Sequence, residues 1–324
     1  MTKRAIVRTA LAYLIGLALL WWVASKVPLH AIAGALTDAK IGVFMPVRIV
    51  EFSILFVGEC YLFARLFSYF QGHATLTEMI RPNAARCFLQ VLNSAVSESV
   101  FALAVSRRLG VGFLGTGFSL LFQALIDIHM LLLMALAGAI LAPSFPLRLP
   151  WTVLIPPIVA LWLMAILWIN GLPPTKLLRW LYNRPSLATF RIARPSHYAR
   201  LSLIRATIFL TQATGFYLEF RAFAVPVTMM QMVAALPIIV LANGTPITPV
   251  GIGTSQAAIV FGFAGMAPRA DLLALSIAHS GVGIALRVML GIFVPGLILT
   301  ASTGADGGVP SVGGLAPSGP LEAS

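Results

Sequence analysis

Long apolar segments separated by short polar stretches make up most of the chain. An α-helix rises 1.5 Å per residue, so about 20 mostly apolar residues cross the roughly 30 Å of bilayer hydrocarbon. The pattern predicts an all-α fold, namely a polytopic integral membrane helical bundle with about seven spanning helices and two interrupted or re-entrant segments. The predicted apolar segments are 5–25, 43–66, 84–106, 113–141, 151–171, 201–222, 228–245, 246–267 and 271–302.

Two of these segments are broken in their middle. Segment 84–106 carries the polar run Asn93–Glu98, and segment 246–267 carries two prolines and two glycines within positions 246–253. Irregular backbone at membrane depth is tolerated only where it packs inside protein or lines a wet cavity. We therefore expect both segments to be interrupted or re-entrant.

The arginines favour a re-entrant first segment. If the N-terminus is cytoplasmic, a full crossing by segment 84–106 would place Arg107 and Arg108 outside. A re-entrant segment keeps them inside, as the positive-inside rule requires, and it also places the next basic loop in the cytoplasm. The basic residues of that loop are Lys176, Arg179, Arg184, Arg191, Arg194, Arg200 and Arg205.

The composition agrees with a membrane protein. Hydrophobic residues make up 59% of the 324 positions and charged residues only 10%, whereas a soluble domain has about 25% charged residues. A net charge of +12 would suit nucleic acid, but the basic residues lie between apolar segments. We therefore expect membrane lipids, including anionic headgroups, as partners and no nucleic acid.

The chain divides into a transmembrane domain, residues 1–302, and a tail, residues 303–324. The tail is rich in Gly, Pro and Ser and is predicted to be disordered. Cys60 and Cys87 belong to no CxxC pair or Cys/His cluster, and no ATP-binding motif is present. We therefore expect no metal and no cofactor.

Two regions about 150 residues apart share one plan, which suggests an internal repeat. The first has the break at Asn93, a short helix, a glycine turn at Gly110 and a long helix containing Asp127. The second has a Pro/Gly break, a short helix, Gly265 and a long helix containing His279. Many transporters are built from repeated halves, with a site where broken helices meet.

Ionisable side chains inside apolar segments are costly in hydrocarbon, so they are candidates for function. Some have a structural explanation. Arg48 and Glu51 are three residues apart and can neutralise each other on one helix face. Glu219 and Arg221 lie near a helix end, where long side chains reach the interface. The full set is Arg48, Glu51, Glu59, Glu98, Asp127, His129, Glu219, Arg221, His279 and Arg287.

Glu98 is the strongest candidate, because it lies in the polar break without a basic residue within one turn of its own helix. We expect Arg287, in the last segment, to be its partner. Asn93 and Asp127 are further candidates for substrate binding, although a structural hydrogen bond explains Asp127 equally well. Asp127 and His129 are two residues apart and face different ways, so they do not form a pair.

The stretch 246–256 is the most distinctive in the chain. Gly251 and Gly253 allow the backbone to approach a ligand or a neighbouring helix closely. A helix that starts at Thr254 or Ser255 would direct its positive dipole end, together with Gln256, towards an anion such as a lipid phosphate. The alternative is that the glycines only permit tight helix packing.

These motifs resemble the lysylphosphatidylglycerol synthase transmembrane, flippase-like family, and its hopanoid-associated branch looks most similar. They are Pro-x-x-Pro-x-Gly-x-Gly-x-x-Gln at 246–256, Asn-x-x-x-Ser-Glu at 93–98 and the ending that contains Arg287, Gly291 and Pro295-Gly296. The resemblance covers roughly residues 5–300. It implies a multi-pass membrane protein whose relatives move aminoacylated phospholipid between leaflets.

The sequence departs from this family in ways that bear on substrate. Ser97 replaces a glycine, and Gln123 and His279 occupy places where the family often has arginine. The loss of charge makes a change of substrate conceivable. The soluble aminoacyl-transfer domain of the synthase has no counterpart in these 324 residues, so lipid synthesis is not implied.

We expect a lipid transporter or flippase-like protein of the bacterial cytoplasmic membrane, and not an enzyme. It would move an anionic or modified lipid between leaflets. One alternative is a non-catalytic accessory subunit that positions a lipid-modifying enzyme. Another is an intramembrane transferase acting on an isoprenoid lipid, which the scarcity of acidic residues in the loops disfavours. The sequence predicts neither the lipid nor the oligomeric state.

Overall fold

The computed structural model describes residues 21, 28–143, 145, 150–169, 176, 188–244 and 253–292 of the chain. Within this part the regular elements are helices, apart from one isolated bridge between Ala264 and Ala267, so the all-α prediction is confirmed. The helices are α2 (Leu29–Asp38), α3 (Ile41–Phe70), α4 (Leu76–Gln90), α5 (Ser94–Leu109), α6 (Phe113–Leu141), α7 (Trp151–Ile169), α9 (Ala188–Ile192), α10 (Pro195–Ala222), α11 (Met229–Gly244), α12 (Thr254–Gly262) and α13 (Arg269–Ile292).

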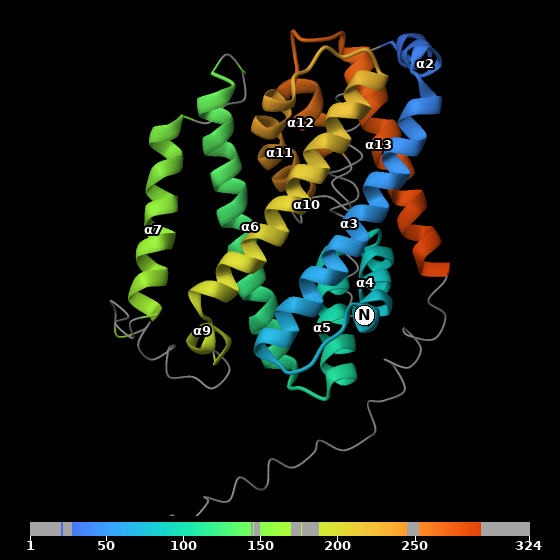
Figure 1. Cartoon of the computed structure of the whole chain (residues 1–324). Helices are drawn as coiled ribbons and strands as arrows, with labels where there is room; N and C mark the ends of the chain where they lie inside the picture. The colour runs from blue at the N-terminus through green and yellow to red at the C-terminus, as the bar shows by residue number, and fades with distance from the viewer. Residues whose placement is uncertain are drawn as a thin grey trace, which may run out of the picture.

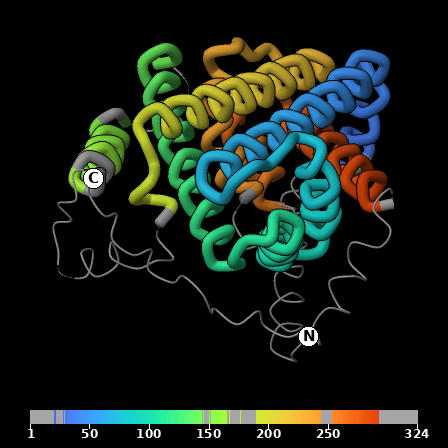
Figure 2. Tube along the Cα trace, turned by 60° about the horizontal axis from the view of Figure 1, so that its bottom comes forward, coloured from blue at the N-terminus to red at the C-terminus, as the bar shows by residue number. Residues whose placement is uncertain are grey.

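Helices α3 and α10 form a central antiparallel pair. Figures 1 and 2 show them side by side across the middle of the molecule. At one end the Lys40 N–H donates to the Ala222 carbonyl at 3.0 Å, and at the other the Tyr69 ring stacks on His197 with centroids 4.4 Å apart. The start of α3 therefore lies beside the end of α10, and this pair is the frame on which the ionic groups are placed.

Helices α4 and α5 pack against each other as a short hairpin beside α3 (Figure 1). The break between them ends at Asn93, whose side-chain oxygen accepts the Val96 N–H at 3.1 Å and caps α5. Gln71, just before α4, donates to Ser119 in the second turn of α6 at 2.9 Å, so the chain enters and leaves the hairpin at the same end. The predicted interruption is confirmed, and the re-entrant position of this hairpin in a membrane stays a prediction.

The second region follows the same order of elements as the first. Helix α12 starts at Thr254, as predicted, after Gly253, which has a φ of 91°. The turns before the two long helices both use a left-handed glycine, Gly110 with a φ of 65° and Gly265 with a φ of 85°. The break itself, residues 245–252, lies outside the described residues, so its contacts stay a prediction.

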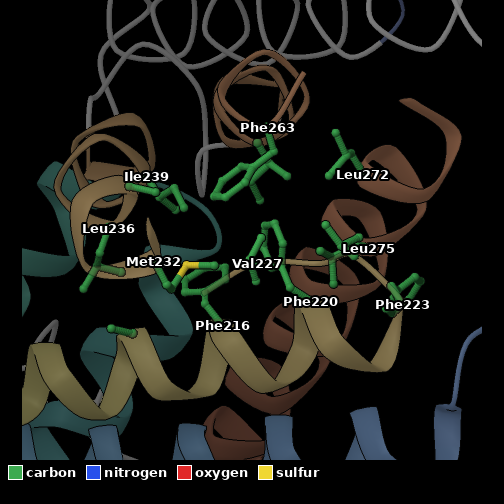
Figure 3. Packing of buried hydrophobic residues seen from close by; sticks show 14 of the residues in the cluster. Phe216, Phe220, Phe223, Val227, Met232, Leu236, Ile239, Phe263, Leu272 and Leu275 are labelled. Carbon is green, nitrogen blue, oxygen red and sulfur yellow. The ribbon is translucent and has the colours of Figure 1, made fainter. Parts of the chain in front are cut away.

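Each half of the molecule has its own apolar core. The first joins α3 to α4, α5 and α6 and includes Phe63 and Phe101. The second joins α10 to α11, α12 and α13 and includes Phe220, Phe263 and Leu275 (Figure 3). The ionic groups described below lie where α3 and α10 connect the two cores.

Three helices are long and apolar enough to cross a membrane by length and composition: Ile41–Phe70, Phe113–Leu141 and Arg269–Gly291. Shorter apolar helices cover Thr152–Met164 and Met229–Asn243. These helices support an integral membrane bundle, whereas the number of about seven spans stays a prediction. Segment 5–25, apart from one residue, and the tail 303–324 lie outside the described residues.

The predicted helix bounds agree best where the apolar run is continuous. Helix α6 has the predicted bounds, 113–141. Helix α10 begins six residues earlier than predicted, because Pro195 stands at its first position, where proline favours helix initiation. Helix α2 was not predicted, since its ten residues are too short for a span.

Candidate functional site

Charged side chains from five helices meet between α3 and α10. We call this group the first ionic cluster: Glu59 on α3, Arg86 on α4, Glu98 on α5, Asp127 on α6 and Arg205 on α10. Such charges at membrane depth require partners, because an unpaired charge in hydrocarbon is costly.

Arg86 holds one half of the first ionic cluster. Its guanidinium bridges the carboxylates of Glu59 and Glu98, and the contact to Glu98 measures 3.1 Å. Its carbon Cζ lies 4.9 Å from the centroid of the Phe63 ring, within cation–π range. The Glu98 side chain is 47% exposed although it is paired, so one of its faces is open to a ligand.

Arg205 holds the other half. Its Nη2 lies 2.5 Å from Asp127 Oδ2, and its Nη1 lies 3.5 Å from Glu59 Oε1. Gln123 also donates to Asp127, at 3.0 Å. The assignment of Arg205 to a basic loop was wrong, because α10 starts at Pro195 and carries Arg205 inside the bundle.

Arg287, on α13, is not the partner of Glu98. The expected pair was wrong because the hairpin places Arg86 of α4 opposite Glu98 of α5. Arg287 lies within electrostatic range of Cys87, Glu59 and Arg86. Among the residues that the structure describes, it has no carboxylate within ion-pair distance, so the guanidinium beside the cluster is half-buried and without a counter-ion.

A second ionic cluster lies nearer the other end of the α3–α10 pair. It consists of Arg48, Glu51, Glu219 and His279. The Arg48–Glu51 contact of 2.5 Å confirms that these two neutralise each other on one helix face. Glu219 is fully buried and its Oε2 lies 2.6 Å from His279 Nδ1, so the expectation that it reaches the interface was wrong. The reason is that α13 packs against this part of the bundle and covers it.

The residues of the second break mainly fix α12. The Gly253 N–H donates to Gln256 Oε1 at 2.6 Å, and Gln256 Nε2 donates to Ser280 of α13 at 2.9 Å. Gln256 is buried and ties the start of α12 to α13. Gly251 lies outside the described residues, so its predicted role as a ligand contact is untested.

The other predicted site residues also have partners within the bundle. Asn93 caps α5, and Asp127 belongs to the first ionic cluster. Asp127 and His129 have different partners, Arg205 and Tyr198, which confirms that they are not a pair. The structure thus brings Glu98 and Asp127 into one cluster and gives Asn93 a structural role.

Sequence reasoning missed Arg86 as a site residue, although it lies within the predicted segment 84–106. A signal was present. Arg86 and Glu98 are twelve residues apart on either side of a polar break, which is the spacing that a helical hairpin needs to place them face to face. Arg205 was missed because it stands close to a basic loop in the sequence.

Comparison with known families finds a match over most of the chain. A family model described as the lysylphosphatidylglycerol synthase TM region matches residues 9–291. The chain belongs to this family. The lysylphosphatidylglycerol synthase transmembrane match covers both ionic clusters and both broken segments, so the site described above lies within the family domain.

The family and the apolar helices together identify an integral membrane protein related to lipid modification. Among curated proteins, none matches this member of the lysylphosphatidylglycerol synthase transmembrane family. The finer function is therefore argued from the site.

Proposed function

We propose that the protein moves a lipid between the leaflets of the bacterial cytoplasmic membrane, as a multi-pass transporter without enzymatic activity of its own. The observation that carries this proposal is Arg287. A half-buried guanidinium without a carboxylate partner among the described residues is suited to an anionic ligand, and in a membrane the abundant anion is a lipid phosphate.

The charges of the first ionic cluster support a headgroup site. Glu59, Glu98 and Asp127 bring three negative charges, and Arg86 and Arg205 bring two positive ones. Arg287 interacts electrostatically with Glu59 at longer range, and no ion pair joins the two among the described residues. The cluster therefore presents separated charges of both signs, which suit a headgroup that carries a phosphate and an amine. In this proposal the phosphate binds Arg287 and the amine binds the exposed face of Glu98.

Helix α12 contributes to the same side of α13. Gln256, in its first turn, binds Ser280, and Ser280 lies seven residues before Arg287. Seven residues are two turns, so Ser280 and Arg287 share one face of α13 about 10 Å apart. The start of α12 thus contacts the face of α13 on which Arg287 lies. In this proposal both broken segments are re-entrant.

The proposal is tested by leaflet exchange in liposomes. The purified full chain is reconstituted with a panel of reporter-labelled phospholipids and isoprenoid lipids, and exchange is compared with empty liposomes. Arg287→Ala and Glu98→Ala are the test variants, and Arg65→Ala, which changes an exposed arginine on α3, is the matched control. We expect exchange by the wild type and the control and a loss of about tenfold in either test variant, the effect of one charged hydrogen bond.

Each outcome decides between specific alternatives. Exchange that is equal in all variants would contradict the assignment of Glu98 and Arg287 but not transport. No exchange of any lipid would overturn the proposed function and favour an accessory subunit that positions a lipid-modifying enzyme. Appearance of a chemically altered lipid would favour the transferase alternative.

A further inference from the structure

The second ionic cluster has no part in the proposed headgroup site, yet it buries more charge than its ion pairs can neutralise. Glu51 is 3% exposed and Glu219 is 0% exposed, and among the described residues the guanidinium in contact with them is that of Arg48. Arg287, the other nearby cation on α13, makes no ion pair with either carboxylate within the described ranges. When His279 is neutral, two carboxylates and one guanidinium leave one negative charge in a buried place, which a bound proton would remove.

Oxygen atoms of these carboxyl groups also lack hydrogen-bond donors, which agrees with a missing positive charge. One oxygen of each carboxyl group, Glu51 Oε1 and Glu219 Oε1, is buried without a hydrogen-bond donor. Both carboxyl groups face the same guanidinium, since Arg48 contacts Glu51 at 2.5 Å and Glu219 at 3.8 Å. An ionised carboxylate is an acceptor only, whereas a protonated carboxyl group can donate a hydrogen bond from one of these oxygens.

His279 and Arg48 complete the surroundings of this carboxyl pair. The His279 ring stacks on Phe216 of α10 with centroids 4.4 Å apart, which fixes its Nδ1 towards Glu219. Arg48 Nη1 binds Glu51, and its Nε lies 3.8 Å from Glu219. The charged and titratable groups that face the pair are therefore Arg48 from α3, His279 from α13 and, at longer range, Arg287 from α13.

A surface groove of about 540 Å³ between α3 and α10 leads to Glu51. Glu51 is the ionisable residue of its lining, and Gly215 beside it leaves the room that the carboxyl group occupies, since a Cβ there would lie 2.5 Å from Glu51 Cδ. The groove also includes Pro46 and Leu218, which stand five and four residues from the ends of their helices. It therefore connects Glu51 to within about 8 Å of one end of the helix pair.

We propose that Glu51 and Glu219, held by Arg48 and His279, form a proton-binding site that exchanges its proton with water through the α3–α10 groove. On release, the O–H bond of the protonated carboxyl group breaks and the proton passes to a water molecule in the groove. The carboxylate that remains stays next to Arg48. Proton binding does not rest on the proposed lipid transport; only a coupling of the two would.

Infrared difference spectra of the reconstituted full chain between acidic and alkaline pH test proton binding directly. We expect a carboxylic-acid C=O band that is present at acidic pH and lost at alkaline pH. Glu51→Gln and Glu219→Gln should each remove it, because the glutamine amide supplies an N–H donor and the remaining carboxylate then needs no proton. Glu78→Gln, which changes a half-buried carboxylate at the start of α4, should leave it unchanged.

Three results would overturn the proposal: a band that survives both glutamine variants, a band that does not change with pH, or a titrating signal of imidazolium in place of the carboxylic acid. Helical circular dichroism shows whether each variant is folded. A misfolded glutamine variant is replaced by Glu51→Asp, which keeps a carboxyl group one methylene shorter and is expected to shift the band instead of removing it.

Access through the groove is tested by filling it. Ile54→Trp places a large ring in the groove, whereas Ile49→Trp changes an exposed residue of the same helix outside the groove. We expect deuterium exchange of the carboxylic acid to slow at least severalfold in Ile54→Trp and to stay at the wild-type rate in Ile49→Trp. Equal rates in both variants would contradict access through the groove. Because these measurements need no lipid exchange, they can succeed or fail independently of the proposed function.

Discussion

At the scale of single residues, the charges of the first ionic cluster find their partners on neighbouring helices. Arg86 illustrates the rule, because its guanidinium contacts Glu59 and Glu98 from two other helices while its side chain is only 12% exposed. Removing one partner of such a group leaves the other charges buried without compensation. The cost then exceeds the net contribution of the original pair.

Arg86→Leu is therefore expected to lower the free energy of unfolding by about 3 kcal/mol, near the lower end of the range for breaking a buried pair because Glu98 is half exposed. Arg65→Leu, at an exposed position on α3, should change it by about 0.5 kcal/mol or less. Thermal unfolding in detergent, followed by circular dichroism, measures both. An equal loss in the two variants would show that the Arg86 contacts do not stabilise the bundle.

The sequence indicated which positions carry buried charge but not which positions contact each other. Glu98, Asp127 and Arg287 were found because ionisable residues in apolar segments are few. Their partners depend on helix packing, which the pattern of one chain does not determine. Arg205 shows the limit, since it lay within the predicted segment 201–222 but was counted with the basic loop next to it.

At the scale of elements, helix ends and glycine contacts hold the hairpin and the long helices in place. Helix α4 begins with a capping box in which Thr75 accepts the Glu78 N–H and Glu78 accepts the Thr75 N–H at 2.8 Å. The donors of Thr75 lower the pKa of the Glu78 carboxyl below its ordinary value. The cap is thus a pH-dependent part of the hairpin.

A lowered pKa in the folded state stabilises the protein above the unfolded pKa, and that stabilisation is lost as the pH falls through the folded value. We expect Glu78→Gln to lower the midpoint of thermal unfolding slightly at pH 7. The difference from the wild type should shrink as the pH falls below about 4, the ordinary carboxyl range. A difference that stays constant over this pH range would show that the carboxylate charge does not contribute.

Helices α6 and α11 approach so closely that one position has no room for a side chain. A Cβ on Gly138 would lie 2.4 Å from the backbone Cα of Ala234, and small residues at helix contacts are typical of membrane bundles. Gly138→Ala is expected to cost about 1 to 3 kcal/mol, as overpacking does. Gly117→Ala on the same helix, where nothing lies within 4 Å, should be neutral or stabilising in the same unfolding assay.

A Gly138 variant as stable as the Gly117 variant would contradict the tight α6–α11 contact.

The sequence predicted α6 with its observed bounds, because a mostly apolar run of 29 residues leaves little choice. It joined α4 and α5 into one segment, because a three-residue break gives only a weak signal in an apolar run. The glycine contact could not be predicted, since it depends on which helix lies opposite.

At the scale of the whole molecule, the two halves repeat one plan around an antiparallel pair of helices. In the first ionic cluster Arg205 of α10 contacts Glu59 of α3, and in the second Arg48 of α3 approaches Glu219 of α10. A residue of a long helix completes each cluster, Asp127 of α6 at Arg205 and His279 of α13 at Glu219. The halves are therefore similar in design but differ in chemistry, because the first cluster has two arginines and an aspartate where the second has one arginine and a histidine.

This difference explains how one frame can serve two purposes. The first ionic cluster has an exposed carboxylate and an adjacent arginine without a counter-ion in the described part of the chain, which suits a headgroup. The second is mostly buried, and the α3–α10 groove leads to it, which suits a proton. The plan was visible in the sequence as two regions with the same order of elements, whereas the pairing across α3 and α10 was not.

The measurement that tests the central claim most directly is leaflet exchange of two reporter lipids that differ only in the headgroup, one with a phosphate alone and one with a phosphate and a primary amine. The account predicts that Arg287→Met slows exchange of both lipids by about tenfold, since both lose the phosphate contact. It predicts that Glu98→Gln slows only the lipid with the amine. Equal effects of Glu98→Gln on both lipids, or no effect of Arg287→Met on either, would contradict the proposed headgroup site.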